Sequence, residues 1–254
     1  MLKAENLKRW MLTGNNSLET LQEVNIMSEL AYVNLRPEHA EQLEALQKLV
    51  FPGVPDEMLF HADEFVHHAR IFPEGTIVVL DGERVVGLGA GLLVDFDFEH
   101  PEHTLMSIMG DDGYYRNHNP NGAYYYGTDI SVHPDYRRRG IGRRLYELRK
   151  DITRRLNKKG IIAGGVLPGF IHYMDRMSAL EYVTRVVAGE IYDPTLSFQI
   201  ENGFRVLGVL PDYFPHPASG GYASFIVWDN PDYQPMASFL FEKLPVRQHV
   251  DHSH

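Results

Sequence analysis

The segment that most constrains this chain is a cluster of arginines and glycines between a predicted strand and a predicted helix. Five of the eight residues from Arg137 to Arg144 are arginines, and Gly140 and Gly142 lie among them. Glycines let backbone amides approach an anion closely, and a helix N-terminus adds unpaired N–H groups and a partial positive charge. The segment therefore predicts a pyrophosphate site. The alternative is that the arginines only coat a solvated helix start.

Two better-known phosphate motifs do not match this segment. The dinucleotide fingerprint requires a third glycine where Leu145 stands, and the P-loop requires a Gly-Lys-Ser/Thr sequence that is absent. The net charge of -10 argues against general nucleic-acid binding, because phosphates are bound by a basic face. The chain has no cysteine, which excludes disulfides and a cysteine nucleophile and agrees with a reducing compartment.

Hydrophobic periodicity predicts one α/β (α+β) domain with a mixed sheet and helices on both of its faces. The predicted strands lie at 32–35, 76–80, 84–94, 123–132, 161–166, 205–210 and 222–228. The predicted helices lie at 37–50, 56–70, 140–157, 178–188 and 194–202. The N-cap signal for the last of these is Asp193, followed by Pro194.

The same patterns divide the chain into three parts. We expect a helical arm at 1–29, the main domain at 30–232 with insertions near 95–122 and 167–192, and a tail at 233–254. The histidines of this tail read more simply as a disordered end than as a weak metal site, so no metal is expected. No stretch approaches the length of a membrane span, which makes a cytoplasmic location without a membrane partner the expectation.

A longer string around the arginines resembles a known signature. Residues 129–142 read DISVHPDYRRRGIG. This closely resembles the acetyl-CoA signature of the GNAT superfamily of N-acetyltransferases, in which a strand ending in Val-x-Pro precedes Arg/Gln-x-x-Gly-x-Gly/Ala. The order of elements from 31 to 228, about three quarters of the chain, is similar too. The resemblance implies the GNAT fold, with a mostly antiparallel twisted sheet, and acetyl-CoA as cosubstrate.

The resemblance also implies roles for individual residues. The backbone of Ile130, Ser131 and Val132 would pair with the pantetheine arm. The pyrophosphate would be wrapped by the residues that follow the turn, namely Arg137, Arg138, Arg139, Gly140, Ile141, Gly142 and Arg143. The strand at 161–166 would splay from the strand at 123–132, opening the slot where the thioester meets the amine.

A closer likeness is to a bacterial subgroup in which a GNAT domain is often fused to a carbon-nitrogen hydrolase. The stretches that match this subgroup lie at 70–75, 116–120, 164–169 and 193–204. Because the chain ends soon after its final predicted strand, we expect the hydrolase to be absent. With no cysteine, no nucleophile of that hydrolase type remains either.

The expected chemistry is direct attack by a primary amine on the thioester, with a backbone N–H near Ile130 stabilising the oxyanion. An alkyl amine has a pKa of about 10.4, so the site needs a base. Asp129 at the strand end is the first candidate, although it could instead fix the turn. His118 could serve if the insertion folds over the slot, or it could be structural. Asp111 and Asp112 could attract a cationic substrate, or lie in a solvated loop.

Many GNAT members place a tyrosine before the last Gly-Phe pair, where it protonates the departing thiolate. Alignment on Gly203-Phe204 puts Gln199 at that position, and Gln199 is no such acid. The candidate substitutes are Tyr192, Tyr173 and Ser197, for each of which packing or helix capping is the plainer reading. Tyr124, Tyr125 and Tyr126 could line the acceptor pocket or simply fill a strand.

The function that this resemblance implies is transfer of acetyl from acetyl-CoA to a primary amine, either a small cationic molecule or a protein lysine or N-terminus. One alternative is a catalytically silent acyl-CoA-binding module that regulates a partner through residues 1–29. A second is transfer of a longer acyl group. Dimerisation is common among similar proteins, so a homodimer is expected.

Overall fold

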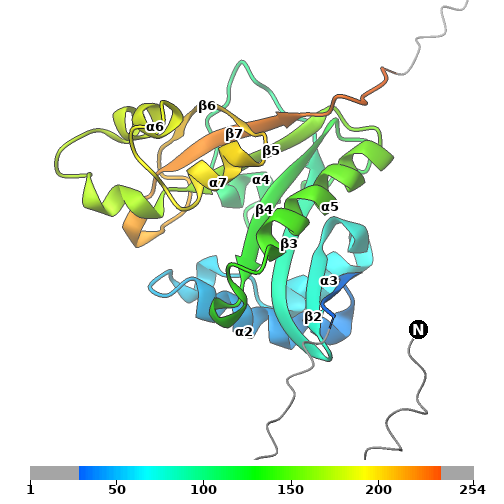
Figure 1. Ribbon diagram of the computed structural model, residues 1–254. Coiled ribbons are helices and arrows are strands. Elements are labelled where there is room, and N and C mark those ends of the chain that lie inside the picture. Colours follow the sequence, from blue (N-terminus) through cyan, green and yellow to red (C-terminus); the bar gives the residue numbers. More distant parts are fainter. Residues whose placement is uncertain (1–28, 236–254) are drawn as a thin grey trace, which may run out of the picture.

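The computed structural model describes residues 29–235, which build a seven-stranded sheet between helices (Figure 1). The strands, in chain order, are β1 (Ala31–Asn34), β2 (Ile77–Asp81), β3 (Arg84–Val94), β4 (Tyr124–Val132), β5 (Gly160–Val166), β6 (Arg205–Leu210) and β7 (Ala223–Asp229). They lie in the order β1-β2-β3-β4-β5-β7-β6. Every neighbouring pair is antiparallel except β4 and β5, so the mixed, mostly antiparallel sheet is confirmed.

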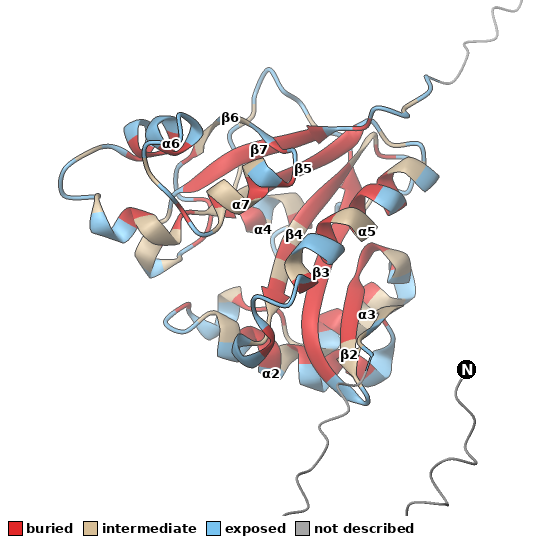
Figure 2. Cartoon of the chain, in the orientation of Figure 1, coloured by how far each residue is buried: buried red, intermediate tan, exposed pale blue. Residues whose placement is uncertain are grey.

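The helices are α2 (Ala40–Val50), α3 (Ala62–Ile71), α4 (Leu105–Met109), α5 (Ile141–Arg155), α6 (Ala179–Val187) and α7 (Leu196–Glu201). They cover both faces of the sheet, as predicted. On one face, Leu43 of α2 joins a buried cluster with Leu88 of β3. On the other face, Leu145 of α5 joins a separate cluster with Val86 of β3. The inner strands β2, β3, β4, β5 and β7 are buried along most of their length, whereas the edge strands β1 and β6 are mostly half-buried or exposed (Figure 2).

The sheet splits where β4 and β5 diverge (Figure 1). Their parallel pairing covers only Tyr124–Gly127 against Gly160–Ala163. Beyond that point β5 pairs only with β7, and the predicted splay is confirmed. The register of β3 against β4 also shifts here, because Ala90 faces Asp129 whereas Gly91 faces Gly127. Such a bulge bends a strand locally.

A buried arginine fastens this bulge. Arg149 of α5 is only 3 % exposed, and its Nη2 donates hydrogen bonds to the carbonyl oxygens of Ala90, at 2.5 Å, and of Asp129. Charge-assisted bonds to two carbonyls replace ladder bonds that the bulge leaves unmade. The geometry at the mouth of the splay therefore depends on a side chain from the helix beneath it.

The structure differs from the sequence-based expectation in two local respects. The polar insertion at 95–122 contains the short helix α4, whose N-cap Thr104 accepts a hydrogen bond from the Ser107 amide at 3.0 Å. Helix α7 begins at Leu196 rather than at Pro194. Asp193 Oδ1 accepts hydrogen bonds from the amides of Thr195 and Leu196, each at 2.8 Å. Asp193 thus caps the helix, but it lies three residues before the first helical residue instead of one.

Several expectations lie outside the described residues, including nearly all of the predicted arm at 1–29 and the tail histidines at 249, 252 and 254. Within residues 29–235, no helix is long and apolar enough to cross a membrane. Within the same range, no three His, Asp or Glu side chains gather in a way that could hold a metal ion.

Candidate functional site

A cavity of about 920 Å³ opens at the splay of β4 and β5. Its lining includes Ile141 and Tyr146, which belong to the buried cluster on the α5 face. It also includes Phe60 and Phe214, which belong to the cluster on the α2 face. The cavity therefore joins the two faces of the sheet through the gap between the strands.

The turn before α5 forms one end of the cavity. Gly140 has a φ of +80°, a left-handed conformation that glycine adopts without strain, and the space where a Cβ would stand is open. Arg144 is the first residue of this helix start whose amide has a backbone partner, because it donates to the Gly140 oxygen at 3.0 Å. Within residues 29–235, the N–H groups of Ile141, Gly142 and Arg143 have no hydrogen-bond partner. Unpaired amides at a helix N-terminus are suited to an anion.

The predicted cofactor residues divide into those that line the cavity and those that do not. The lining residues are Ile130, Val132, Arg137, Arg138, Gly140, Ile141, Gly142 and Arg143. Arg139 instead stacks over the Tyr136 ring, with its Cζ 4.7 Å from the ring centroid. Ser131 is buried, and its hydroxyl donates to the Asp129 carboxylate. Three arginines and a row of free amides thus line the same end of the cavity.

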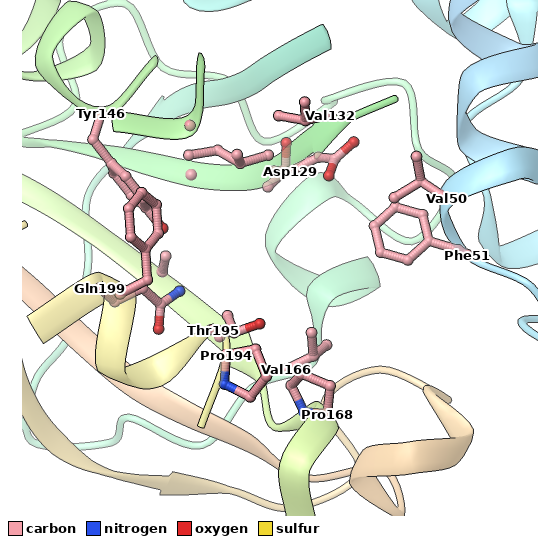
Figure 3. Close-up of a pocket in the computed structure, with 18 of the residues that line it drawn as sticks. Val50, Phe51, Asp129, Val132, Tyr146, Val166, Pro168, Pro194, Thr195 and Gln199 are labelled. Carbon is pink, nitrogen blue, oxygen red and sulfur yellow. The ribbon is translucent and has the colours of Figure 1, made fainter. Parts of the chain in front are cut away.

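Asp129 lies beside the bulge and lines the cavity. Its carboxylate accepts hydrogen bonds from Gln47 Nε2 at 2.5 Å and from Ser131 Oγ at 2.8 and 3.0 Å. Figure 3 shows this carboxylate directed toward Val50 and Phe51. Burial raises the pKa of Asp129 to about 6, although the two hydrogen-bond donors hold part of that rise back. A carboxylate with such a pKa is ionised at neutral pH and is a better proton acceptor than an exposed one.

A tyrosine that the sequence analysis did not single out also lines the cavity. Tyr146 of α5 points toward Gln199 of α7 (Figure 3). Burial raises the pKa of its phenol, and the Arg149 guanidinium and a hydrogen bond with Gln199 offset part of that rise. The Oε1 atom of Gln199 is buried and has no hydrogen-bond partner among the described residues. Gln199, aligned with the tyrosine of other GNAT members, thus lies beside a phenol contributed by another helix.

The other predicted acid–base candidates do not line the cavity. The His118 ring stacks on Phe72 with centroids 4.7 Å apart, and its Nδ1 accepts the Leu93 amide at 3.2 Å. Tyr192 is 70 % exposed on the outside of the molecule. The remaining positions that lie away from the lining are Asp111, Asp112, Tyr124, Tyr125, Tyr126, Tyr173 and Ser197.

The cavity ends, on the α2 face, in apolar side chains that come from distant parts of the chain. They are Val50, Phe51, Met58, Phe60, Leu105, Tyr213 and Phe214. His216, in the segment before β7, lines the cavity as well. Its Nδ1 lies 3.0 Å from Ser219 Oγ, and burial lowers its pKa. No local sequence motif marks this group, because its members meet only when the sheet forms.

Residues 40–166 match the sequence profile described as the acetyltransferase (GNAT) family. The chain is also 34 % identical over 195 residues to "Uncharacterized N-acetyltransferase YkwB" of Bacillus subtilis, which covers 76 % of this chain and 86 % of that protein. The chain belongs to the GNAT family. It is an acyltransferase of that family, and the resemblance drawn from residues 129–142 is confirmed.

A second relative bears on the closer likeness. The chain is 40 % identical over 232 residues to "Probable hydrolase YhcX" of Bacillus subtilis, which covers 90 % of this chain. The match spans only 44 % of that relative's length. A relative that is longer and named a hydrolase agrees with the subgroup in which the GNAT domain is fused to a hydrolase.

Solved structures confirm the fold. The loading GNATL domain of CurA from Lyngbya majuscula superposes with a TM-score of 0.70 at 17 % identity, over 80 % of this chain and 98 % of that one. The GphF GNAT-like decarboxylase in complex with isobutyryl-CoA superposes with a TM-score of 0.64 at 18 % identity, over 80 % and 99 % of the two chains. At these identities the likeness concerns the fold alone.

Proposed function

We propose that this acyltransferase moves an acetyl group from acetyl-CoA to a primary amine. One observation carries the proposal: a single cavity connects an anion-binding helix start, on one face of the sheet, with a buried carboxylate that faces the other side. A thioester placed in the gap between β4 and β5 would meet an amine that arrives from the α2 face. Family membership supports acyl transfer in general, and the acetyl donor and amine acceptor are our inference.

The residues present fit acetyl-CoA. The free amides of Ile141, Gly142 and Arg143, together with the nearby arginines, suit a pyrophosphate. The unpartnered Oε1 of Gln199 suits an amide N–H of the pantetheine arm, since a buried acceptor is costly when left without a hydrogen bond. When bound, acetyl-CoA would supply the activated acetyl group and leave as a thiol.

Asp129 is the proposed base. Its carboxylate, held by Gln47 and Ser131, would pair with the ammonium form of the acceptor and accept one proton as the nitrogen lone pair becomes available. The proton then passes to solvent. Neutralisation of a buried carboxylate by a cation also removes its desolvation cost, which favours binding of the amine at this position.

Tyr146 is the proposed acid for the departing sulfur. Its phenol lies beside Gln199 (Figure 3), and its ring belongs to the buried cluster on the α5 face. A phenol donates its proton to a thiolate and is reprotonated from the second N–H of the reacting amine or from solvent. Tyr146 would supply the acid that Gln199 cannot provide. We therefore favour an active transferase over a catalytically silent acyl-CoA-binding module.

The experiment that tests the proposal is steady-state release of free thiol from acetyl-CoA, measured with and without primary amines. We expect thiol release that depends on the amine and saturates with both substrates. Thiol release that is independent of every amine would point to hydrolysis and contradict the proposal. The cytoplasmic location and the homodimer stay predictions, to be checked by cell fractionation and by light scattering of the purified protein.

A further inference from the structure

The charges around the cavity are distributed unevenly. Among the described residues of its lining, Asp129 is the only carboxylate. The cationic side chains of the lining, Arg137, Arg138, Arg143 and Arg149, come from α5 and the turn that precedes it. The acidic residues of the described chain, apart from Asp129, therefore lie outside the cavity lining. A substrate with several cationic groups would find one counter-ion here.

The walls opposite the arginines are mostly apolar. Phe51 and Phe214 meet edge to face with ring centroids 6.1 Å apart. Phe60, Leu105 and Phe214 are each at most 7 % exposed, so these side chains form a closed surface behind the cavity. The Asp129 carboxylate is directed toward Val50 and Phe51 of this wall (Figure 3).

The Asp129 carboxylate accepts hydrogen bonds from Gln47 and Ser131, while the nearest guanidinium, that of Arg149, donates to backbone carbonyls instead. A cation placed beside the carboxylate would offset more of its desolvation cost, whereas a longer acyl chain placed there would cover it without doing so. An amine supplies such a cation, and its carbon skeleton gains free energy by leaving water for the apolar wall. The wall and the carboxylate together therefore suit one molecule with one charged end.

We propose that the acceptor is a primary monoamine with an apolar body, alkyl or aralkyl, whose ammonium pairs with Asp129 while its body packs against Phe51 and Phe214. This inference rests on the proposed amine acetylation and narrows its substrate class. It makes polyamines and peptide amines poorer acceptors, since the described lining holds no second carboxylate for a second cation, and the polar side chains near the wall are few, namely Gln47, Tyr213 and His216.

The test compares amine acceptors that differ in apolar length or in the number of charges, with acetyl-CoA as donor. In the series from propylamine to hexylamine, kcat/KM is expected to rise about fourfold for each methylene that becomes buried. Pentylamine is expected to exceed 1,5-diaminopentane and a lysine-containing peptide by about tenfold or more, because a second cation stays unpaired. Calorimetric titration of the same amines into the protein saturated with CoA should give the same order of affinity.

A pair of adjacent substitutions on α2 provides the matched variants. Val50 lines the cavity near Asp129, whereas Leu49 is 48 % exposed and lies outside the lining. Val50→Asp adds a second carboxylate to the pocket, so the ratio of kcat/KM for 1,5-diaminopentane to that for pentylamine should rise about tenfold or more. Leu49→Asp adds the same charge to the surface, and it should leave that ratio unchanged.

The outcomes separate this inference from the function on which it rests. Thiol release with diamines or peptides above that with alkyl monoamines would overturn the inference and leave amine acetylation standing. A flat amine series together with faster turnover of hexanoyl-CoA than of acetyl-CoA would also overturn it, because the wall would then hold the acyl chain. No amine-dependent release at all would overturn both.

Discussion

The two ends of the cavity are built in different ways. The proposed cofactor end comes from one continuous stretch, from Ile130 on β4 to Arg143 in the first turn of α5. The proposed acceptor end comes from side chains as far apart in the chain as Val50 and Phe214. The first end consists of free backbone amides and arginine side chains, and the second consists of packed apolar side chains with one carboxylate. A sequence motif can therefore predict the binding site of the donor, whereas the binding site of the acceptor depends on how distant segments pack.

The largest effect is expected from breaking the cofactor end. The double variant Gly140→Asp/Gly142→Asp places carboxylates in the anion site, and a side chain at 142 would also meet Phe198, whose Cε1 is 3.3 Å from the position of the new Cβ. We expect acetyl-CoA affinity, measured by calorimetry, to fall by about a thousandfold or more, the loss of two or three charge-assisted bonds.

The matched control for that variant is Gly189→Asp. Gly189 has a φ of +76°, close to that of Gly140, and the space where a Cβ would stand is open at both positions. Gly189 follows α6 and does not line the cavity. The substitution therefore brings the backbone strain of the Gly140 position, together with one of the two added charges, to a site outside the cavity lining. Equal loss of affinity in both proteins would show that strain or net charge, rather than the anion site, controls binding.

Asp129→Asn tests the other end, where we expect kcat/KM to fall about a hundredfold. In the wild type, kcat/KM should rise as pH increases through the Asp129 pKa of about 6 and fall above the amine pKa. The variant should lose the lower limb. Because burial raises this carboxyl pKa, its ionisation costs folding stability as pH rises from about 4 to 6, so the variant should be at least as stable at pH 7. An unchanged lower limb would assign the base elsewhere, with His216 as the next candidate.

Tyr146→Phe removes the proposed acid with little change in shape. We expect kcat to fall about tenfold, less than for many general acids, because a thiol with a pKa near 8.5 is already a fair leaving group. The acetyl-CoA affinity should stay the same. Tyr192→Phe is the control, since that side chain is exposed and outside the cavity. Equal kcat values for Tyr146→Phe and the wild type would mean that the thiolate leaves unaided.

The smallest catalytic effect is expected at His118. His118→Ala removes the acceptor for the Leu93 amide and the stacking contact with Phe72, so the free energy of unfolding, from urea titration, should fall by about 1–2 kcal/mol. Turnover should change by less than about twofold, because a residue outside the lining supplies no proton step. A large loss of kcat in a fully folded variant would return His118 to the catalytic site.

The strands and the turn at 137–143 could be predicted from the sequence, because both depend on local rules. The strand from Arg84 to Val94 and the one from Arg205 to Leu210 were predicted at their observed bounds, since turn residues and apolar runs mark them. Tyr146 was missed because, at helical spacing, it reads as a core residue, and only the packing of α7 against α5 reveals it. The apolar acceptor wall carries no motif, so it became visible only with the fold.

The most direct test of acetyl transfer to an amine is to incubate the wild-type protein with acetyl-CoA and hexylamine and to identify the product by mass spectrometry. If the cavity joins thioester and amine as described, N-acetylhexylamine forms in equal amount to the CoA released. Release of CoA with free acetate and unmodified amine, or consumption of neither substrate, would contradict the account.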